Sequence, residues 1–203
     1  MDPAAAGEKK SAVKKPMFRR LSDLLHRVSK SWVVVFALLI FAAFTGLVLP
    51  AQARNSEGYA GDAGSPDTSF FYTAEDLYET AERYGEEGRS SYVRARFTFD
   101  LVWPLVYTLF LCTGISWVTG RVFREGSLWR RANLVPLFGL LFDYLENLST
   151  ALVMIRYPGQ TPAAAVAAGL FTVVKWALVS ASFLLLLAGG AVGLWRWAAG
   201  RRG

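Results

Sequence analysis

Two acidic side chains and an amide lie inside a long apolar run, in the stretch FDYLEN at residues 142–147. Asp143, Glu146 and Asn147 are three and four residues apart, so they share one face of a helix. A carboxyl group at such a position can act as a general acid, carry a proton or hold a cation. The same residues also serve as polar contacts that lock helices together, so function and structure are both open hypotheses.

Two other apolar runs carry polar residues at a matching depth. Lys175 is the only charged residue of 163–188, and Tyr107 lies within the uncharged run 101–120. At a rise of 1.5 Å per residue, these side chains and the two acids lie about 15–20 Å from the same end of their helices. A mid-bilayer charge costs about 2.5–3.5 kcal/mol on insertion scales, so these groups should face inward and pair. The predicted buried cluster comprises Asp143, Glu146, Asn147, Lys175, Tyr107 and Thr150.

The charges of this cluster do not balance, because two acids share one lysine. We expect Lys175 to neutralise Asp143, which leaves Glu146 without a counter-charge. A carboxyl in a low-dielectric interior without a counter-ion should be protonated near neutral pH. The functional hypothesis therefore rests on Glu146.

A second group of polar residues is predicted at the outer mouth of the bundle. Tyr92, Arg96 and Asp100 follow one another at four-residue steps and share a helical face. Arg96 can pair with Asp100, and a structural role is favoured for this pair because Arg96 lies near the interface. Pro104 removes the helical hydrogen bond to the carbonyl of Asp100. The freed carbonyl is expected to accept a cation, a water or another side chain.

The elements that must position these residues are membrane-length helices. The chain has 203 residues, of which 53% are hydrophobic, and its mean hydropathy is +0.30. Its apolar residues form blocks of about 18 or more, which is enough to cross a bilayer. Backbone groups in lipid must be satisfied within each segment, which favours helices. The predicted fold is an all-α four-transmembrane-helix bundle with an amphipathic N-terminal helix and a short exterior helix.

The predicted segments follow from the apolar runs and the charged stretches between them. They are a basic cytoplasmic segment with an amphipathic helix at 1–31, spans at 32–50, 99–120, 133–155 and 163–188, an exterior loop at 51–98 with an acidic helix at 74–84, a cytoplasmic loop at 121–132, an exterior loop at 156–162 and a cytoplasmic tail at 189–203. As an alternative, residues 32–53 are a cleaved signal peptide, because small residues follow the first apolar run.

Positive charges predict the orientation of the bundle. Lysine and arginine gather in the N-terminal segment, in the loop 121–132 and in the tail, whereas the loop 51–98 is rich in acids. We therefore expect a multi-pass protein of the bacterial plasma (inner) membrane with both termini in the cytoplasm, and membrane lipids as its partners. The net charge of +6 is spread over three segments rather than one face, so no nucleic acid partner is expected.

Two flanking helices are predicted from local patterns. Apolar residues at helical spacing after Pro16 indicate an amphipathic helix on an anionic leaflet; they are Phe18, Leu21, Leu25, Val28 and Trp32. Thr73 with Asp76 forms a plausible capping box, and Gly85 a plausible C-terminal stop, for the acidic helix. We expect that helix to lie on the end of the bundle with its apolar face inward, either as a lid or as a surface cover.

The chain contains few side chains that could bind a metal ion or take part in redox chemistry. The chain has one cysteine, Cys112, and one histidine, His26, so no disulfide, haem or zinc site is expected. No cofactor and no metal are predicted, although a carboxylate-only site for a hard cation stays open.

Several phrases of the sequence resemble a family of small uncharacterised bacterial four-helix integral membrane proteins. The phrases are YTAEDLY, YGEEGRSSY, FDLVWPLVY, FDYLEN and RYP, between Phe71 and Pro158. The resemblance implies a shared four-helix architecture and supplies no activity. It implies that particular positions recur, namely Tyr84, Gly85, Gly88, Arg89, Tyr92, Asp100, Pro104, Tyr107, Asp143, Glu146 and Asn147.

Three functions are consistent with these patterns. The first is a protein that binds, or binds and modifies, a lipid or small amphiphile in a cavity lined by the polar cluster. The second is a proton- or cation-coupled permease, which would need a homo-oligomer because four helices enclose little space. The third is a non-catalytic membrane scaffold or accessory subunit of a partner membrane protein. Whether the protein is an enzyme is left open by the sequence.

Overall fold

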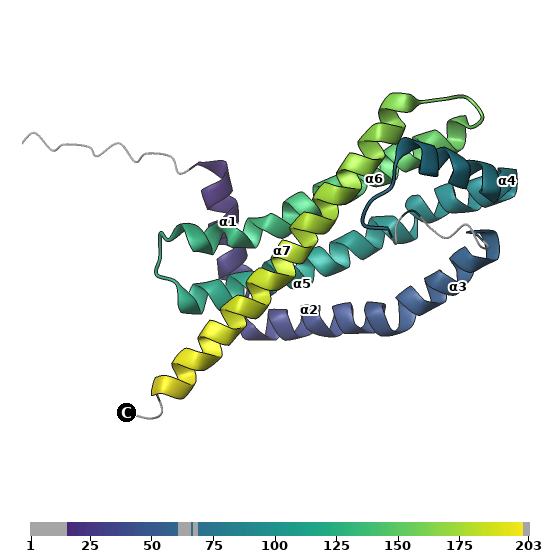
Figure 1. The fold of residues 1–203 in the computed structure, drawn as a ribbon. Coiled ribbons are helices and arrows are strands. Elements are labelled where there is room, and N and C mark those ends of the chain that lie inside the picture. The colour runs from purple at the N-terminus through teal and green to yellow at the C-terminus, as the bar shows by residue number, and fades with distance from the viewer. Residues whose placement is uncertain (1–15, 61–65, 67–68, 201–203) are drawn as a thin grey trace, which may run out of the picture.

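The computed structural model describes residues 16–60, 66 and 69–200, and no strand occurs among them. The elements, in chain order, are α1 (Met17–Val28), α2 (Ser31–Ala43), the π-helical segment η1 (Phe44–Val48), α3 (Leu49–Ala60), α4 (Ala74–Arg96), α5 (Phe99–Val122), the 3-10 helix η4 (Leu128–Leu134), α6 (Val135–Arg156) and α7 (Pro162–Gly200) (Figure 1). The remaining residues of the predicted N-terminal segment, exterior loop and tail lie outside the described part of the chain.

Four helical runs are long and apolar enough to cross a membrane, which confirms the predicted all-helical class and the number of candidate spans. They are Ser31–Gly58, Ala74–Val122, Leu128–Arg156 and Pro162–Gly200. Large apolar side chains face outward along these helices, for example Leu39 on α2 and Leu184 and Leu187 on α7. Such a surface suits lipid better than water.

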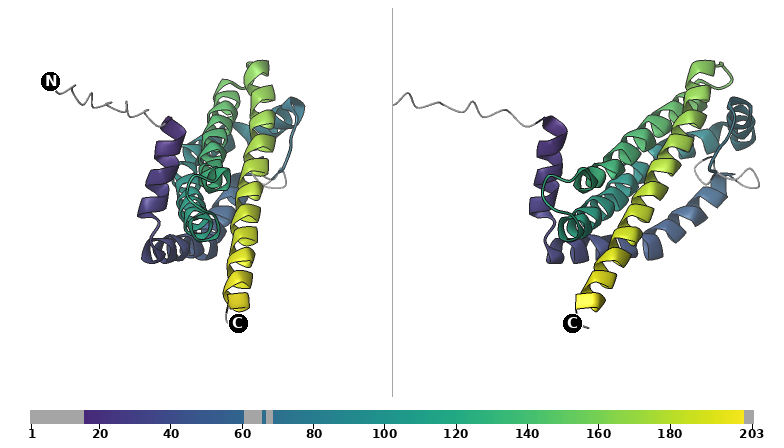
Figure 2. Two further views of the ribbon diagram at one scale, coloured as in Figure 1. Left: turned by 90° about the vertical axis from the view of Figure 1, so that its left-hand side faces the viewer. Right: turned by 60° about the vertical axis from the view of Figure 1, so that its left-hand side comes forward.

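The bundle is built around α5, α6 and α7. Helix α6 packs along α7, and α5 packs on both; α2 lies against α5, and α3 lies against α4. Helix α1 lies across one end of the bundle and the first half of α4 across the other (Figure 1). Figure 2 shows α5 and α6 between α1 on one side and α7 on the other. These ends are called the α1 end and the α4 end below.

The first candidate span bends, because the π-helical segment η1 interrupts it. Pro50 lies two residues after this segment and lacks the N–H that would bond to the carbonyl of Gly46, four residues earlier. Proline and π-bulges are among the usual causes of helix kinks. The run then continues as α3 to Ala60, ten residues beyond the predicted end at 50. Packing of α3 on α4 holds these polar and glycine-containing residues in a helix that their composition did not indicate.

Helix α4 consists of two parts that meet at Gly85, where the sequence predicted that the acidic helix ends. Thr73 and Asp76 form the capping box, and Gly85 has φ 62 and ψ −174, a conformation that favours glycine. Leu77 and Ala81 on the first part are fully buried against a cluster that includes Met154. The second part ends at Arg96, and a break at Phe97–Thr98 separates it from α5.

Helix α7 is longer than predicted, because it runs to Gly200 rather than ending near 188. Gly189 does not stop it. A Cβ at that position would overlap the side chain of Val118, so the glycine lets α7 approach α5 closely. Near its end, Arg196 Nη1 donates to the carbonyl of Val122 at 2.6 Å, and this bond ties the extended helix to α5.

Candidate functional site

A closed polar cluster surrounds Glu146 at the centre of the bundle. Lys175 Nζ lies 2.5 Å from Glu146 Oε2. Thr172 Oγ1 donates to Glu146 Oε1 at 2.5 Å, and the hydroxyl of Tyr72 donates to the same oxygen at 3.2 Å. Glu146 is 0% exposed. Both carboxylate oxygens are therefore occupied by protein groups, and we call these four residues the Glu146 cluster.

Close helix packing brings this cluster together. Thr172 and Lys175 are one turn apart on α7 and face α6, on which Glu146 stands. Tyr72 precedes α4 and reaches the cluster because Gly169 on α7 leaves room for its backbone. A Cβ at Gly169 would overlap the carbonyl oxygen of Tyr72.

The expected charge assignment is wrong at this point. Lys175 forms its ion pair with Glu146, where the sequence suggested Asp143, and Glu146 is not the acid left without a counter-charge. The reason is the rotation between the two acids. Three residues turn the helix by about 300°, so the two side chains point in directions that differ by about 60°. As a result, Glu146 faces α7 while Asp143 faces α5. Depth alone could not separate them.

An open polar cluster surrounds Asp143. The hydroxyl of Tyr107 donates to Asp143 Oδ2 at 2.9 Å, and Asn147 Nδ2 donates to Asp143 Oδ1 at 3.1 Å. Asn147 Oδ1 accepts from Arg96 Nη1 at 3.3 Å, and Arg96 Nη2 pairs with Asp100 Oδ2 at 2.8 Å. These five residues, the Asp143 cluster, link α4, α5 and α6 in one chain of hydrogen bonds.

The carbonyl of Asp100, which Pro104 leaves without its helical hydrogen bond, is bound by a side chain. A cation, a water or a side chain was expected there. Asn147 Nδ2 also points to the carbonyl of Asp100 at 3.4 Å. One residue further along, the hydroxyl of Tyr144 donates to the carbonyl of Leu101 at 2.8 Å. Side chains of α6 therefore compensate the backbone of α5 where proline interrupts it, and they fix the two helices against each other.

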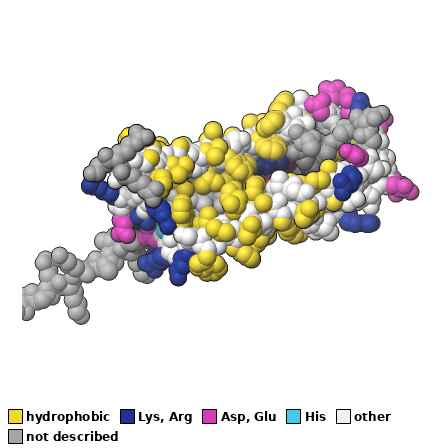
Figure 3. All heavy atoms as spheres, turned by 90° about the horizontal axis from the view of Figure 1, so that it is seen from below, with side chains coloured by type: hydrophobic (Ala, Val, Ile, Leu, Met, Phe, Trp, Pro, Cys, Tyr) yellow, Lys and Arg dark blue, Asp and Glu magenta, His cyan; other side chains and the backbone are white. Residues whose placement is uncertain are grey.

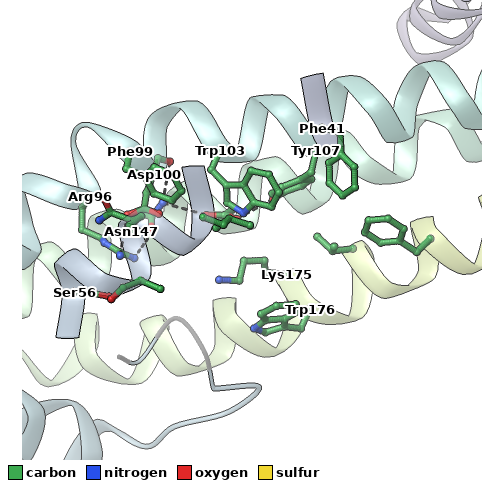
Figure 4. A pocket seen from close by; sticks show the side chains of 16 residues that line it. Phe41, Ser56, Arg96, Phe99, Asp100, Trp103, Tyr107, Asn147, Lys175 and Trp176 are labelled. Carbon is green, nitrogen blue, oxygen red and sulfur yellow. Dashed lines mark hydrogen bonds and ion pairs between the residues drawn. The ribbon is translucent and has the colours of Figure 1, made fainter. Parts of the chain in front are cut away.

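The Asp143 cluster lines a central cavity of about 510 Å³ between α2, α3, α5, α6 and α7. Figure 4 shows Arg96, Asp100 and Asn147 grouped at one end, Phe41 at the other and Lys175 between them. Seen from below in Figure 3, the molecule is hollowed between bands of hydrophobic side chains, and basic and acidic side chains are visible inside the hollow. The volume falls in the range of small-molecule pockets.

Aromatic side chains form the walls and floor of the central cavity. Phe41 on α2 stacks on Trp103 at 5.7 Å and lies 6.0 Å from Phe183 on α7, which closes the cavity toward the α1 end. On the other wall, Trp176 lies beside Lys175, whose Nζ is 5.5 Å from the ring centroid. Gln52 and Ser56 add polar groups on the α3 side. The cavity is thus apolar at the floor and polar toward the α4 end.

The predicted residues divide between the two clusters, and two of them join neither. Asp143, Asn147, Lys175, Tyr107, Arg96 and Asp100 line the cavity, whereas Glu146 is sealed behind it. Thr150 donates to the carbonyls of Glu146 and Asn147 within its own helix. Tyr92 is fully buried beneath Arg96, whose guanidinium carbon is 4.4 Å from the ring centroid, so it supports Arg96 from below.

Several site residues were missed from the sequence. Thr172 lies three residues before Lys175, and this spacing on one helical face could have identified it. No sequence signal connected Tyr72, Phe41 or Trp176 to the site, because they come from a loop or from apolar runs without a polar marker.

The arrangement offers charged and hydrogen-bonding groups of both signs. Arg96 and Lys175 can hold an anionic oxygen, and Asp100 and Asp143 can accept hydrogen bonds from hydroxyl or ammonium groups. Within the described residues, no group of three or more His, Cys, Asp or Glu side chains is placed to hold a metal ion. The cavity is therefore equipped to bind a polar headgroup next to an apolar body.

Comparison of the chain with protein-family models, with curated proteins and with solved structures gives no significant match. The resemblance to small bacterial four-helix membrane proteins therefore rests on the sequence motifs alone and stays a prediction.

Proposed function

We propose that this chain is a multi-pass membrane protein that binds a lipid or small amphiphile in the central cavity. The observation that carries the proposal is the cavity itself, which combines an aromatic floor with a charged, hydrogen-bonding end. An amphiphile has the same division into an apolar and a polar part. Its tail would lie against Phe41, Trp103 and Trp176, and its headgroup among the side chains of the Asp143 cluster.

The charges favour a headgroup that both donates and accepts hydrogen bonds. Arg96 and Lys175 face the cavity together with Asp100 and Asp143, so side chains of both signs line it, and Lys175 also pairs with Glu146 behind the wall. A zwitterionic or hydroxyl-bearing headgroup can satisfy all four, whereas a purely anionic or cationic one would leave two like charges opposed. Asp143 replaces Glu146 as the acid expected to contact the ligand, because Asp143 lines the cavity.

We place the bundle in the bacterial inner membrane with both termini in the cytoplasm. The excess of lysine and arginine in the N-terminal segment, in the loop after α5 and in the tail supports this orientation. The α1 end would then face the cytoplasm, and the central cavity would open toward the outer half of the bilayer.

The test is the identity of the molecule that copurifies with the gently solubilised protein, measured by mass spectrometry. A bound amphiphile should be present in the wild type and lost in Ala53→Trp, because Ala53 lines the cavity and a large ring there would fill it. Ala42→Trp is the matched control, since Ala42 is exposed on α2 outside the cavity. Equal occupancy in both variants would contradict binding in the cavity.

The permease remains the second hypothesis and predicts a different result. Proton or cation flux into proteoliposomes should then be present in the wild type and fall in Asp143→Asn. No amphiphile should copurify with either protein. If neither flux nor a bound amphiphile is found, the non-catalytic scaffold or accessory subunit is the remaining function.

A further inference from the structure

A second recess lies far from the central cavity, at the α1 end. This basic pocket of about 370 Å³ is formed between α1 and the segment that joins α5 to α6. Its charged lining consists of Arg19, Arg27, Arg130, Arg131, Asp23 and Glu125. Four guanidinium groups against two carboxylates leave an excess of two positive charges, so the pocket favours an anion.

Contacts made by His26 and Asn133 hold the pocket in shape. His26 Nδ1 and Nε2 lie 3.0 and 3.1 Å from the carbonyls of Ser116 and Arg130. Asn133 Nδ2 donates to the carbonyl of Ser22 at 3.2 Å and to Ser116 Oγ at 2.9 Å. Helix α1 is therefore docked through backbone carbonyls, the ring of His26 and the buried amide of Asn133, and Arg130 takes part in this docking through its backbone carbonyl.

The opposite side of α1 is apolar and exposed. Its large side chains face outward, namely Met17, Phe18, Leu21, Leu24 and Val28. The helix lies across the end of the bundle (Figures 1 and 2), so in a membrane it would run along the surface, with this side in the acyl region. The basic pocket next to it would then lie at the level of the lipid phosphates.

From these observations we propose that the basic pocket binds the phosphate of an anionic phospholipid headgroup. Arg19 and Arg130 are the less exposed pair and would hold the phosphate oxygens, because the planar guanidinium fork matches their geometry. Arg27 and Arg131 form the exposed rim. The acyl chains would continue from the pocket into the lipid beside the apolar side of α1. The two carboxylates limit the excess positive charge, which suits a phosphodiester with a single negative charge.

The experiment titrates short-chain phosphatidylglycerol and phosphatidylcholine into the full-length protein in neutral detergent, with bound lipid counted by native mass spectrometry. The pocket variant is Arg19→Gln with Arg130→Gln. The matched control is Arg20→Gln with Arg124→Gln, which removes two arginines from the same two regions, neither of which lines the pocket. We expect the wild type and the control to bind phosphatidylglycerol about tenfold more tightly than phosphatidylcholine, and the pocket variant to lose this preference.

Three outcomes would overturn the proposal. If both double variants lose the preference for phosphatidylglycerol equally, diffuse surface charge causes the preference. If the pocket variant keeps the full preference, the pocket is not the binding site. The third outcome concerns a titration with inorganic phosphate. If it binds without lipid as tightly as phosphatidylglycerol, the site serves a water-soluble phosphate compound. Should the double variant fail to fold, Arg130→Gln alone keeps the test valid, because the carbonyl that accepts from His26 is retained; this single variant should still lower the preference for phosphatidylglycerol.

Discussion

The Glu146 cluster and the Asp143 cluster begin three residues apart on the same helix, yet they differ in almost every physical respect. Around Glu146, a lysine, a threonine and a tyrosine occupy the carboxylate in a site closed to solvent. Around Asp143, neutral donors hold the carboxylate at the wall of a cavity. Both arrangements join helices, and the second also presents a polar surface to the cavity.

The difference shows how a single polar stretch can serve both roles. A buried ion pair repays its desolvation cost only when its geometry is good and its remaining hydrogen bonds are made, and the Glu146 cluster meets both conditions. A carboxylate at a cavity wall keeps access to a ligand while its neighbours fix its orientation. We therefore expect substitutions in the first cluster to affect stability and substitutions in the second to affect binding.

The largest effect should follow from Glu146→Gln. This change removes the carboxylate that pairs with Lys175, and breaking a buried pair from one side costs about 3–5 kcal/mol. We expect a corresponding loss in the free energy of unfolding, measured by denaturant titration in detergent. The double variant Glu146→Leu with Lys175→Met should recover most of the loss, since it removes both charges. If the double variant is as unstable as the single one, the unpaired buried charge is not the cause of the loss, and the two clusters do not differ in the proposed way.

Gly169→Ala tests the closed cluster without touching a charge. The added methyl group would overlap the carbonyl of Tyr72 and should displace the tyrosine hydroxyl from Glu146. Overpacking of this kind costs about 1–3 kcal/mol, which a thermal unfolding measurement resolves. Gly190→Ala is the control, because nothing lies within 4 Å of a Cβ at that position. Similar behaviour of the two variants would show that Tyr72 does not depend on this close approach.

Asp143→Asn should separate binding from stability. The amide keeps the shape of the carboxylate and one acceptor oxygen, so the unfolding free energy should fall by less than about 1.5 kcal/mol. Occupancy of the copurifying amphiphile should fall about tenfold, as expected when a hydrogen bond to a charged group is lost. Quantitative mass spectrometry of extracted ligand measures this. If the variant retains its ligand but unfolds readily, Asp143 contributes to stability rather than to ligand binding.

The smallest effect is expected at His26, which lies outside both clusters. Burial lowers the pKa of His26 from its ordinary value of 6.5, against hydrogen bonds to the carbonyls of Arg130 and Ser116 that raise it. The positive charge of Arg130 lowers the pKa further, and Asp23 raises it. Because the docked state binds the proton more weakly than the free helix, docking of α1 is strongest above pH 6.5 and weakens as the pH falls below that value.

Hydrogen exchange of the α1 amides at pH 7.5 and 5.5, corrected for intrinsic rates, measures this dependence. His26→Asn should remove it while exchange in α5 and α6 stays unchanged. An equal pH dependence in the variant would place the titrating group elsewhere, and a large change in the two central clusters would show that the α1 end is coupled to them.

Much of the fold was accessible from the sequence because membrane helices are specified by composition. Long apolar runs predict spans wherever backbone groups must be satisfied internally, and the capping box at Thr73 and the stop at Gly85 are local signals that the structure confirms. The ends of the first and last spans were not accessible. Helices α3 and α7 continue because they pack against α4 and α5, and a propensity scale does not contain those neighbours.

By itself, the sequence determined that acids, an amide and a lysine lie at similar heights in a bundle of membrane-length helices, because hydropathy marks the apolar runs and the helical rise fixes the position along them. Only the tertiary structure decided which acid meets Lys175, because the partner depends on the rotation of α6 and α7 about their axes. Close packing of Gly139 on α6 against Val179 on α7 contributes to that rotation. It turns Glu146 into the closed interface with α7 and Asp143 toward the cavity.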